Sequence, residues 1–334
     1  MTVDVHAHIV PVELMEMLKR DGASFGIEHF VSDRGDDMLR LAGTKEIGPF
    51  PEELFDLDGR IAAMDAGAVR TQLVSHRTDF SAYVLEPENG VRYARAFNEI
   101  LADEVDQHPH RLRALGTVPL QSPRDAASEL EYLVGDLRMV GVEIASNVNG
   151  IHLADADLDP FWEVANESRC FVLLHPYDPL TGFDLSRYFL SNILGRPAES
   201  TIAIAHLLFG GVLERYPDLV LCMVHGGGYM PYQIGRWEKG YKMAPHLTAA
   251  NIERSPLDFV KRLYFDSLVH IPEALAFLLE LVGPTQVVVG TDYPYPMSER
   301  QPVEFINSVP GLDATDRQLI LEGNVERIVE GIRR

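Results

Sequence analysis

The chain has 334 residues, of which 46% are apolar, which suits one large domain with a buried core. It carries 29 Lys and Arg against 50 Asp and Glu, a net charge of −21, so it lacks the basic surface that nucleic acids and anionic membranes attract. No apolar run approaches the roughly 20 residues that span a bilayer, and no signal-like segment opens the sequence. The two cysteines lie in apolar runs and indicate buried thiols. We therefore expect a soluble cytoplasmic protein without a nucleic-acid or membrane partner.

The first predicted element is a strand at Val3–His8, and it carries two histidines. Apolar and polar residues alternate along it, which is the period of a strand. Residues two apart on a strand point to the same face, so His6 and His8 lie side by side, close enough to bind one metal ion. A pair of core histidines would have the same spacing, so these two residues alone leave both interpretations open.

Seven further short apolar runs follow, and most are separated by stretches with helical spacing. The runs cover residues 71–76, 113–118, 141–145, 170–175, 219–225, 263–266 and 286–291. Helical patterns include residues 89–107, 124–137 and 272–282. Strand and helix alternate eight times, which predicts a single α/β domain over residues 1–334 with a (β/α)8 TIM-barrel fold. An open doubly wound sheet is disfavoured, because no Gly-x-Gly-x-x-Gly motif follows the first strand.

The connection between the first and second strands, residues 9–70, is much longer than an ordinary βα loop. Helical stretches at residues 12–20 and 59–66 flank a segment at 28–55 that is rich in Gly, Asp and Pro. Connections of this length are usually functional. We predict that an insertion at about residues 10–58 forms a small lid over the mouth of the barrel.

Three more potential metal ligands lie at the C-terminal ends of predicted strands. His175 closes the fifth strand, His225 closes the sixth, and Asp292 follows the eighth. Active sites of this barrel lie at that end, so the three side chains would meet His6 and His8 there. Imidazole nitrogens and carboxylate oxygens suit Zn, and also Mn or Fe. Each residue also has a structural alternative. His175 could hydrogen-bond a backbone group, His225 could cap a helix, and Asp292 could belong to a turn.

The motifs around these residues resemble the amidohydrolase superfamily, and more narrowly its amidohydrolase-2 branch. They read His6-Ala7-His8, His175-Pro176, His225-Gly226-Gly227-Gly228 and Gly290-Thr291-Asp292-Tyr293-Pro294. The similarity runs nearly end to end and includes Arg60-Ile61-x-x-Met64-Asp65 and Gly323-Asn324. The branch includes α-amino-β-carboxymuconate-ε-semialdehyde decarboxylase and γ-resorcylate decarboxylase.

The resemblance implies that His6, His8, His175 and Asp292 bind one divalent metal, with Zn as the first choice and Mn as the second. It also implies that His225 acts beside the metal as the acid/base on a bound water or substrate, with Asp292 as the other catalytic residue. Many amidohydrolases hold two metals bridged by a carbamylated lysine on the fourth strand, and the predicted fourth strand here contains no lysine.

A second metal would therefore depend on Glu143, the only candidate bridging carboxylate on that strand. A hydrogen-bonding role is the favoured interpretation of Glu143, so we predict a single metal.

A divalent metal beside a histidine supports hydrolysis, hydration or non-oxidative decarboxylation. The resemblance favours decarboxylation of an aromatic or unsaturated carboxylic acid, in which a carbon is protonated as CO₂ leaves and no organic cofactor is needed. A metal-dependent hydrolase (a lactonase or amidohydrolase) or a hydratase acting on an aromatic ring-cleavage intermediate is the alternative. A barrel that only binds is disfavoured, because no expected ligand residue is missing.

Two arginines bind the substrate carboxylate in the resembled decarboxylases, and only one has a counterpart here. The insertion arginine is missing, since the aligned stretch reads Glu46-Ile47-Gly48-Pro49-Phe50. The other arginine, which the branch contributes across a dimer interface, matches Arg236. The resemblance therefore implies a homodimer and a small carboxylic acid substrate that differs from the branch's best-known one. A surface ion pair is the alternative role for Arg236.

Overall fold

A computed structural model describes residues 2–155, 157–177 and 184–333 of the chain. Eight parallel strands follow one another around a barrel: β1 (Val3–His8), β5 (Thr71–Ser75), β6 (Leu112–Gly116), β7 (Gly141–Ala145), β10 (Phe171–His175), β11 (Val220–Met223), β12 (Tyr264–Asp266) and β13 (Val287–Val288). The sheet closes where the Val5 amide donates to the Val289 carbonyl at 2.8 Å. These strands confirm the predicted (β/α)8 barrel and all eight of its predicted strands.

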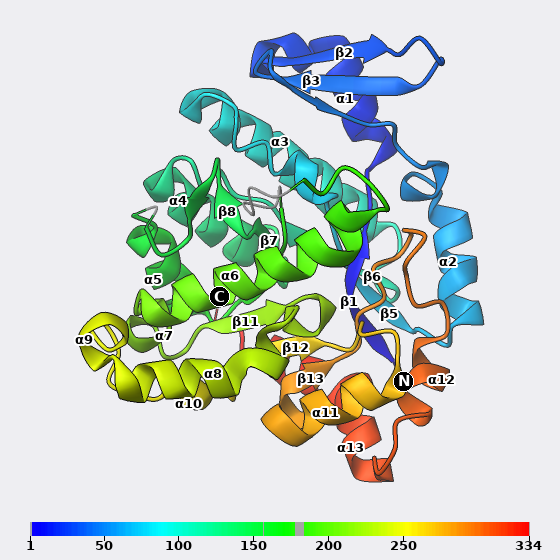
Figure 1. Cartoon of the computed structure of the whole chain (residues 1–334). Coiled ribbons are helices and arrows are strands. Elements are labelled where there is room, and N and C mark those ends of the chain that lie inside the picture. Colours follow the sequence, from blue (N-terminus) through cyan, green and yellow to red (C-terminus); the bar gives the residue numbers. More distant parts are fainter. Residues whose placement is uncertain (1, 156, 178–183, 334) are drawn as a thin grey trace.

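Helices surround the barrel (Figure 1). They are α1 (Val12–Asp21), α2 (Leu57–Ala66), α3 (Pro87–Asp106), α4 (Pro123–Gly135), α5 (Asp159–Ser168), α6 (Arg196–Phe209), α7 (Val212–Arg215), α8 (Met230–Met243), α9 (Pro245–Thr248), α10 (Pro256–Val260), α11 (Pro272–Val282), α12 (Pro302–Asn307), α13 (Ala314–Gln318) and α14 (Asn324–Glu330). Most of the longer helices begin with proline in the first turn, where its missing N–H has no partner to lose. Of the helices that the structure describes, none is both long and apolar enough to traverse a bilayer.

The interior of the barrel is a packed apolar core. Side chains from the strands, among them Val5, Leu73 and Phe171, meet Val325 and Ile328 of α14. Helix α14 therefore closes the N-terminal end of the barrel.

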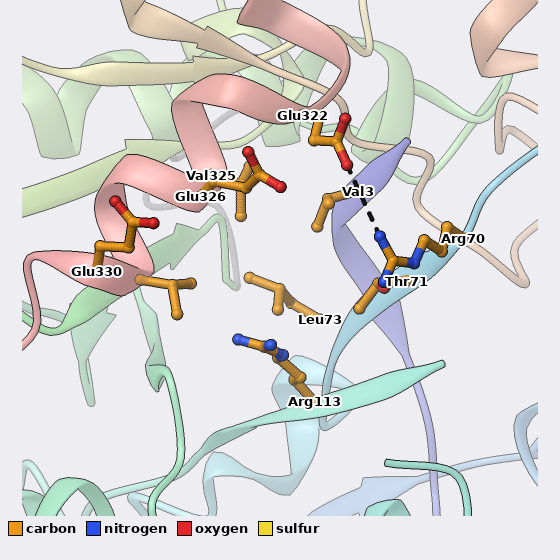
Figure 2. A pocket seen from close by; sticks show the side chains of 10 residues that line it. Val3, Arg70, Thr71, Leu73, Arg113, Glu322, Val325, Glu326 and Glu330 are labelled. Atoms are coloured by element: carbon orange, nitrogen blue, oxygen red, sulfur yellow. Dashed lines mark ion pairs between the residues drawn. The ribbon is translucent and has the colours of Figure 1, made fainter. Parts of the chain in front are cut away.

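A cavity of about 330 Å³ lies beside this plug, between α14 and the first residues of β1, β5 and β6. Figure 2 shows Arg70 and Arg113 on one side of the cavity and Glu322, Glu326 and Glu330 on the other. Arg70 and Glu322 approach to 3.8 Å. The cavity lies at the opposite end of the barrel from the predicted metal ligands, so the chemistry predicted above does not involve it.

The long connection after β1 folds as a small antiparallel sheet between two helices. Strands β2 (Ile27–Val31), β3 (Asp37–Leu41) and β4 (Lys45–Ile47) pair in order, and the predicted helices at 12–20 and 59–66 appear as α1 and α2. Figure 1 shows β2 and β3 projecting beyond the C-terminal end of β1. The Lys45 ammonium lies 3.8 Å from the ring centroid of Tyr177, which follows β10. The insertion thus reaches the loops at that end, although its role as a lid stays a prediction.

Candidate metal centre

Five side chains that the sequence singled out meet at the C-terminal end of the barrel. The Nε2 atoms of His6 and His8 are 3.2 Å apart, and Oδ1 of Asp292 lies 3.4 Å from the first and 3.2 Å from the second. His175 and His225 complete the group, since one potential ligand atom from each of His6, His175, His225 and Asp292 lies within 4.8 Å of the others. The fold therefore joins residues that lie on or just after four strands and are up to 286 positions apart in the chain.

The other ring nitrogen fixes the orientation of each histidine expected to bind metal. Nδ1 of His6 donates to Oδ2 of Asp266 at 2.8 Å, and Nδ1 of His8 donates to the His76 carbonyl at 2.8 Å. Nδ1 of His175 lies 2.6 Å from Oγ1 of Thr78 and 3.0 Å from the Pro176 carbonyl. With the proton on Nδ1, each Nε2 presents a lone pair to the centre of the group.

This arrangement fits a divalent cation. The Nε2 atoms of His6 and His8 face each other at 3.2 Å while both Nδ1 atoms are already engaged elsewhere, and Oδ1 of Asp292 is buried with no hydrogen-bond partner. For metal–ligand bonds of about 2.0–2.1 Å in a tetrahedral arrangement, ligand atoms stand about 3.3 Å apart. The three separations among His6, His8 and Asp292 match that value. The donor set is therefore that of a divalent-metal site.

The charges within the group are strongly coupled. Burial lowers the pKa of His6, but the carboxylates of Asp266 and Asp292 outweigh it and raise that pKa to about 10. Burial raises the pKa of Asp292, but the imidazoles of His225, His6 and His8 outweigh it and hold the pKa well below its usual range. Burial and the neighbouring histidines lower the pKa of His175. A metal ion would take the place of protons here, because ligands bind in their deprotonated forms.

Two of the five residues have an unusual backbone conformation. His225 has a φ of 55° and Asp292 a φ of 59°, both in the left-handed region that non-glycine residues rarely adopt. Such conformations persist where the surroundings impose them, often at functional sites. The glycines after His225 allow the loop to pack closely. The Gly226 amide donates to Oδ1 of Asp266, and Gly228 cannot carry a side chain, because a Cβ there would lie 2.1 Å from the Pro197 carbonyl oxygen.

His225 differs from the other three histidines in its partners. Its Nε2 lies 3.8 Å from Oδ2 of Asp292, its Nδ1 has no hydrogen-bond partner, and 16% of the side chain is exposed. Its ring centroid lies 5.2 Å from that of His6. Because no carbonyl or carboxylate fixes Nδ1, His225 is the histidine of this group best placed to exchange a proton.

Comparison with known proteins identifies the family. The amidohydrolase family model matches residues 3–330. The chain belongs to the amidohydrolase family. This finding confirms the resemblance drawn from the four motifs.

Among curated proteins, 2-amino-3-carboxymuconate-6-semialdehyde decarboxylase of Dictyostelium discoideum is 32% identical over 96% of this chain and 89% of its own length. Among solved structures, 5-carboxyvanillate decarboxylase of Sphingomonas paucimobilis has a TM-score of 0.83 at 24% identity, covering 99% of both chains. A dihydroxybenzoic acid decarboxylase of Polaromonas sp. JS666, solved with manganese and 2-nitroresorcinol, has a TM-score of 0.78 at 22% identity, covering 98% of this chain and 96% of its own. These two structures share the fold of this amidohydrolase.

Sequence reasoning missed two residues of the amidohydrolase centre. Asp266 is buried at the end of β12 and accepts hydrogen bonds from His6 and Gly226. It could have been found, because it is an acidic residue at the C-terminal end of a predicted barrel strand. Thr78 follows β5 and contacts His175 across 97 positions of sequence. A lone threonine in a loop carries no signal of that contact.

The structure does not bring Arg236 into the group. It lies on α8 with an exposed side chain, so its role toward a substrate stays a prediction. A different arginine lies beside the segment that lacks the expected one. Arg77 donates to the Pro49 carbonyl at 3.3 Å, lies 5.4 Å from the ring centroid of Phe50, and pairs with Asp79 at 2.6 Å.

Proposed function

We propose that this amidohydrolase is a metal-dependent, non-oxidative decarboxylase of an aromatic or unsaturated carboxylic acid. The observation that carries the proposal is the convergence of His6, His8 and Asp292 at 3.2–3.4 Å, with His225 beside them. The full-length similarity to a decarboxylase at 32% identity favours decarboxylation over the other reactions that such a centre could perform.

In this proposal His6, His8, His175 and Asp292 hold one divalent metal, with zinc as the first choice and manganese as the competing one. When bound, the ion acts as a Lewis acid toward a substrate oxygen. The donor set of imidazoles and carboxylate suits both metals, and a neighbour of the same fold binds manganese. One metal is proposed because β7 offers only Glu143, and Thr78 hydrogen-bonds one of its oxygens.

His225 is the proposed acid/base. Its Nε2 is the ring nitrogen 3.8 Å from Oδ2 of Asp292, so a proton on that atom can reach a substrate held at the centre. Its proton would go to the carbon that loses CO₂, and the electron pair of the broken C–C bond would form the new C–H bond. Tyr295, whose ring centroid lies 5.3 Å from that of His8, would form part of the pocket wall.

Two arginines, Arg77 and Arg236, are the proposed binding partners of the substrate carboxylate. Arg77 supplies a cation beside Pro49 and Phe50, the segment of the insertion that lacks the expected arginine.

Arg236 would bind the carboxylate of the other chain's substrate across a homodimer. Exposed side chains on and beside α8 support a dimer. Tyr232 on the helix is 82% exposed, and Ile193, which is 50% exposed, adjoins Leu194, whose carbonyl accepts a hydrogen bond from Tyr229 in the turn before α8. The free, buried thiols of Cys170 and Cys222 suit a reducing cytoplasm.

The reaction type is tested by product analysis. The purified protein, loaded with zinc or with manganese, is incubated in D₂O with 2-amino-3-carboxymuconate 6-semialdehyde, 2,6-dihydroxybenzoate and 5-carboxyvanillate. We expect CO₂ from at least one acid, with one deuterium in the product at the carbon that carried the carboxylate. A product that gains water without CO₂ release, from these acids or from lactones, would instead favour the hydrolase or hydratase.

The role of His225 is tested in the same assay. The His225→Asn variant should keep its bound metal and lose about 10²- to 10⁴-fold in kcat, because general acid–base groups contribute that much. Metal content measured by mass spectrometry is the control. An active variant with full metal content would show that His225 is not the acid/base.

The dimer and Arg236 are tested by complementation. Co-expressed His225→Asn and Arg236→Met chains form mixed dimers, in which one of the two sites has an intact histidine and receives an intact arginine from the other chain. We expect each variant alone to be inactive and the mixture to regain about a quarter of wild-type activity, because half of randomly assorted dimers are mixed. No recovery, or a monomer in solution, would contradict a role for Arg236 across the interface.

A further inference from the structure

We propose that Thr78 and Glu143 form a hydrogen-bonded relay that positions His175 for the metal. Both would be positioning residues, because neither is expected to touch the metal or the substrate. This inference rests on the proposed metal-dependent function and concerns how the chain prepares one of its ligands.

The direction of each hydrogen bond in the relay follows from its atoms. Oγ1 of Thr78 lies 2.6 Å from Nδ1 of His175 and 2.9 Å from Oε1 of Glu143. Nδ1 of His175 also faces the Pro176 carbonyl, which can only accept, so Nδ1 carries the proton. The threonine hydroxyl then accepts from His175 and donates its single proton to Glu143. This direction leaves Nε2 of His175 bare and turned toward the centre.

The relay ties together three separate parts of the barrel. Thr78 begins a short turn after β5, Glu143 lies on β7, and His175 ends β10. Metal-binding histidines commonly donate their second nitrogen to a fixed acceptor, which holds the ring in place and sets its tautomer. Here the acceptor is a hydroxyl, and Glu143 in turn fixes the direction of that hydroxyl.

The charge of Glu143 gives a second and independent reason to connect the relay with the metal. The residue is fully buried, and its Oε2 has no hydrogen-bond partner. Within the described part of the chain, its ion-pair neighbours are two imidazoles, His8 at 3.6 Å and His76 at 3.8 Å, and no Lys or Arg. A buried carboxylate without a cation is strongly unfavourable.

An occupied centre reduces this imbalance. A dication places two positive charges close to Glu143, where the centre otherwise offers neutral imidazoles and the carboxylates of Asp266 and Asp292. Glu143 would therefore cost stability in the metal-free protein and contribute to metal affinity. An ordinary structural residue would stabilise both forms alike.

The test measures zinc affinity by competition with a chromogenic chelator, together with the Tm of metal-free and zinc-loaded full-length protein. Thr78→Val removes the hydroxyl and should weaken zinc binding about 10- to 100-fold, the usual cost of losing such a partner. Thr78→Ser keeps the hydroxyl and should bind zinc within about threefold of wild type. Glu143→Gln can still accept from Thr78 but loses the charge, so it should weaken zinc binding and raise the Tm of the metal-free form.

Thr117→Val is the matched control, because Thr117 is a buried threonine after β6 whose hydroxyl has no hydrogen-bond partner. It should leave zinc affinity unchanged. Wild-type affinity in Thr78→Val, a loss in Thr78→Ser as large as in Thr78→Val, or a lowered metal-free Tm with unchanged affinity in Glu143→Gln would each overturn the relay. Wild-type protein that binds no zinc or manganese would overturn the proposed function itself, which separates the two failures.

Discussion

At the scale of single residues, the Asp266 side chain connects His6 with the loop that carries His225. Its Oδ2 accepts from Nδ1 of His6, while its Oδ1 accepts from the amide of Gly226, directly after His225. One carboxylate therefore orients a proposed ligand and also fixes the loop that carries the proposed acid/base. Because Asp266 is fully buried, water cannot replace either bond.

Replacing Asp266 with Asn should show this double role. Asn has one acceptor oxygen, so it can keep only one of the two bonds, and its amide nitrogen would face a donor. We expect metal affinity to fall about 10- to 100-fold and the free energy of unfolding to fall by about 1–3 kcal/mol. Chelator competition and urea unfolding measure the two effects. Metal binding as tight as in the wild type would show that Asp266 does not orient His6.

Prediction from sequence was most successful at the residues whose position is set by strand ends. His6, His8, His175, His225 and Asp292 could be placed together because all barrel strands point their C-terminal ends to one side. Thr78 could not, since its partner His175 depends on the exact path of the loop after β5. Arg77 was missed for the same reason, because its neighbours Pro49 and Phe50 belong to the insertion.

At the scale of elements, helix α2 supports the metal centre through a buried arginine. Arg60 is 1% exposed, donates to the His8 carbonyl and to Oε1 of Gln72, and lies 4.8 Å from the ring centroid of Tyr293. It thereby joins the helix after the insertion to β1, to β5 and to the segment after β13. Burial lowers the pKa of Arg60 only to about 10, so it stays charged at neutral pH.

The Arg60→Met variant should therefore lose stability. It keeps much of the apolar stem but leaves the His8 carbonyl and Gln72 without their donor, which costs about 1–3 kcal/mol of unfolding free energy. Arg124→Met is the control, because Arg124 is exposed in the first turn of α4. Equal urea midpoints for the two variants would contradict a structural role for Arg60.

The elements themselves differ in how well the sequence predicts them. The barrel strands are largely buried on both faces. Seven appear as short apolar runs and the first as an alternating pattern that ends in two histidines, which made all eight visible. The sheet of the insertion was not predicted, because its strands are short and mostly exposed: the five residues of β2 include only one that is buried. Their Gly, Asp and Pro content gave a loop-like pattern instead.

At the scale of the whole molecule, the two ends of the barrel differ in the side chains that fill them. Helix α14 fills the N-terminal end with Val325 and Ile328, which pack against apolar side chains of the strands. The opposite end gathers four histidines and three buried or half-buried acids (Glu143, Asp266 and Asp292) in one network. Such a network is costly without a cation, so the metal is expected to contribute to folding stability as well as to chemistry.

The measurement that tests this account most directly is a titration of metal into chelator-treated protein while CO₂ release from the best acid of the panel is recorded. The account predicts no CO₂ from the metal-free protein and a linear rise with added zinc or manganese that reaches its plateau at one metal per chain. The His8→Ala variant should fail to regain activity in the same titration. Undiminished CO₂ release from the metal-free protein, or none at any metal content while an ester or lactone is hydrolysed, would contradict the account.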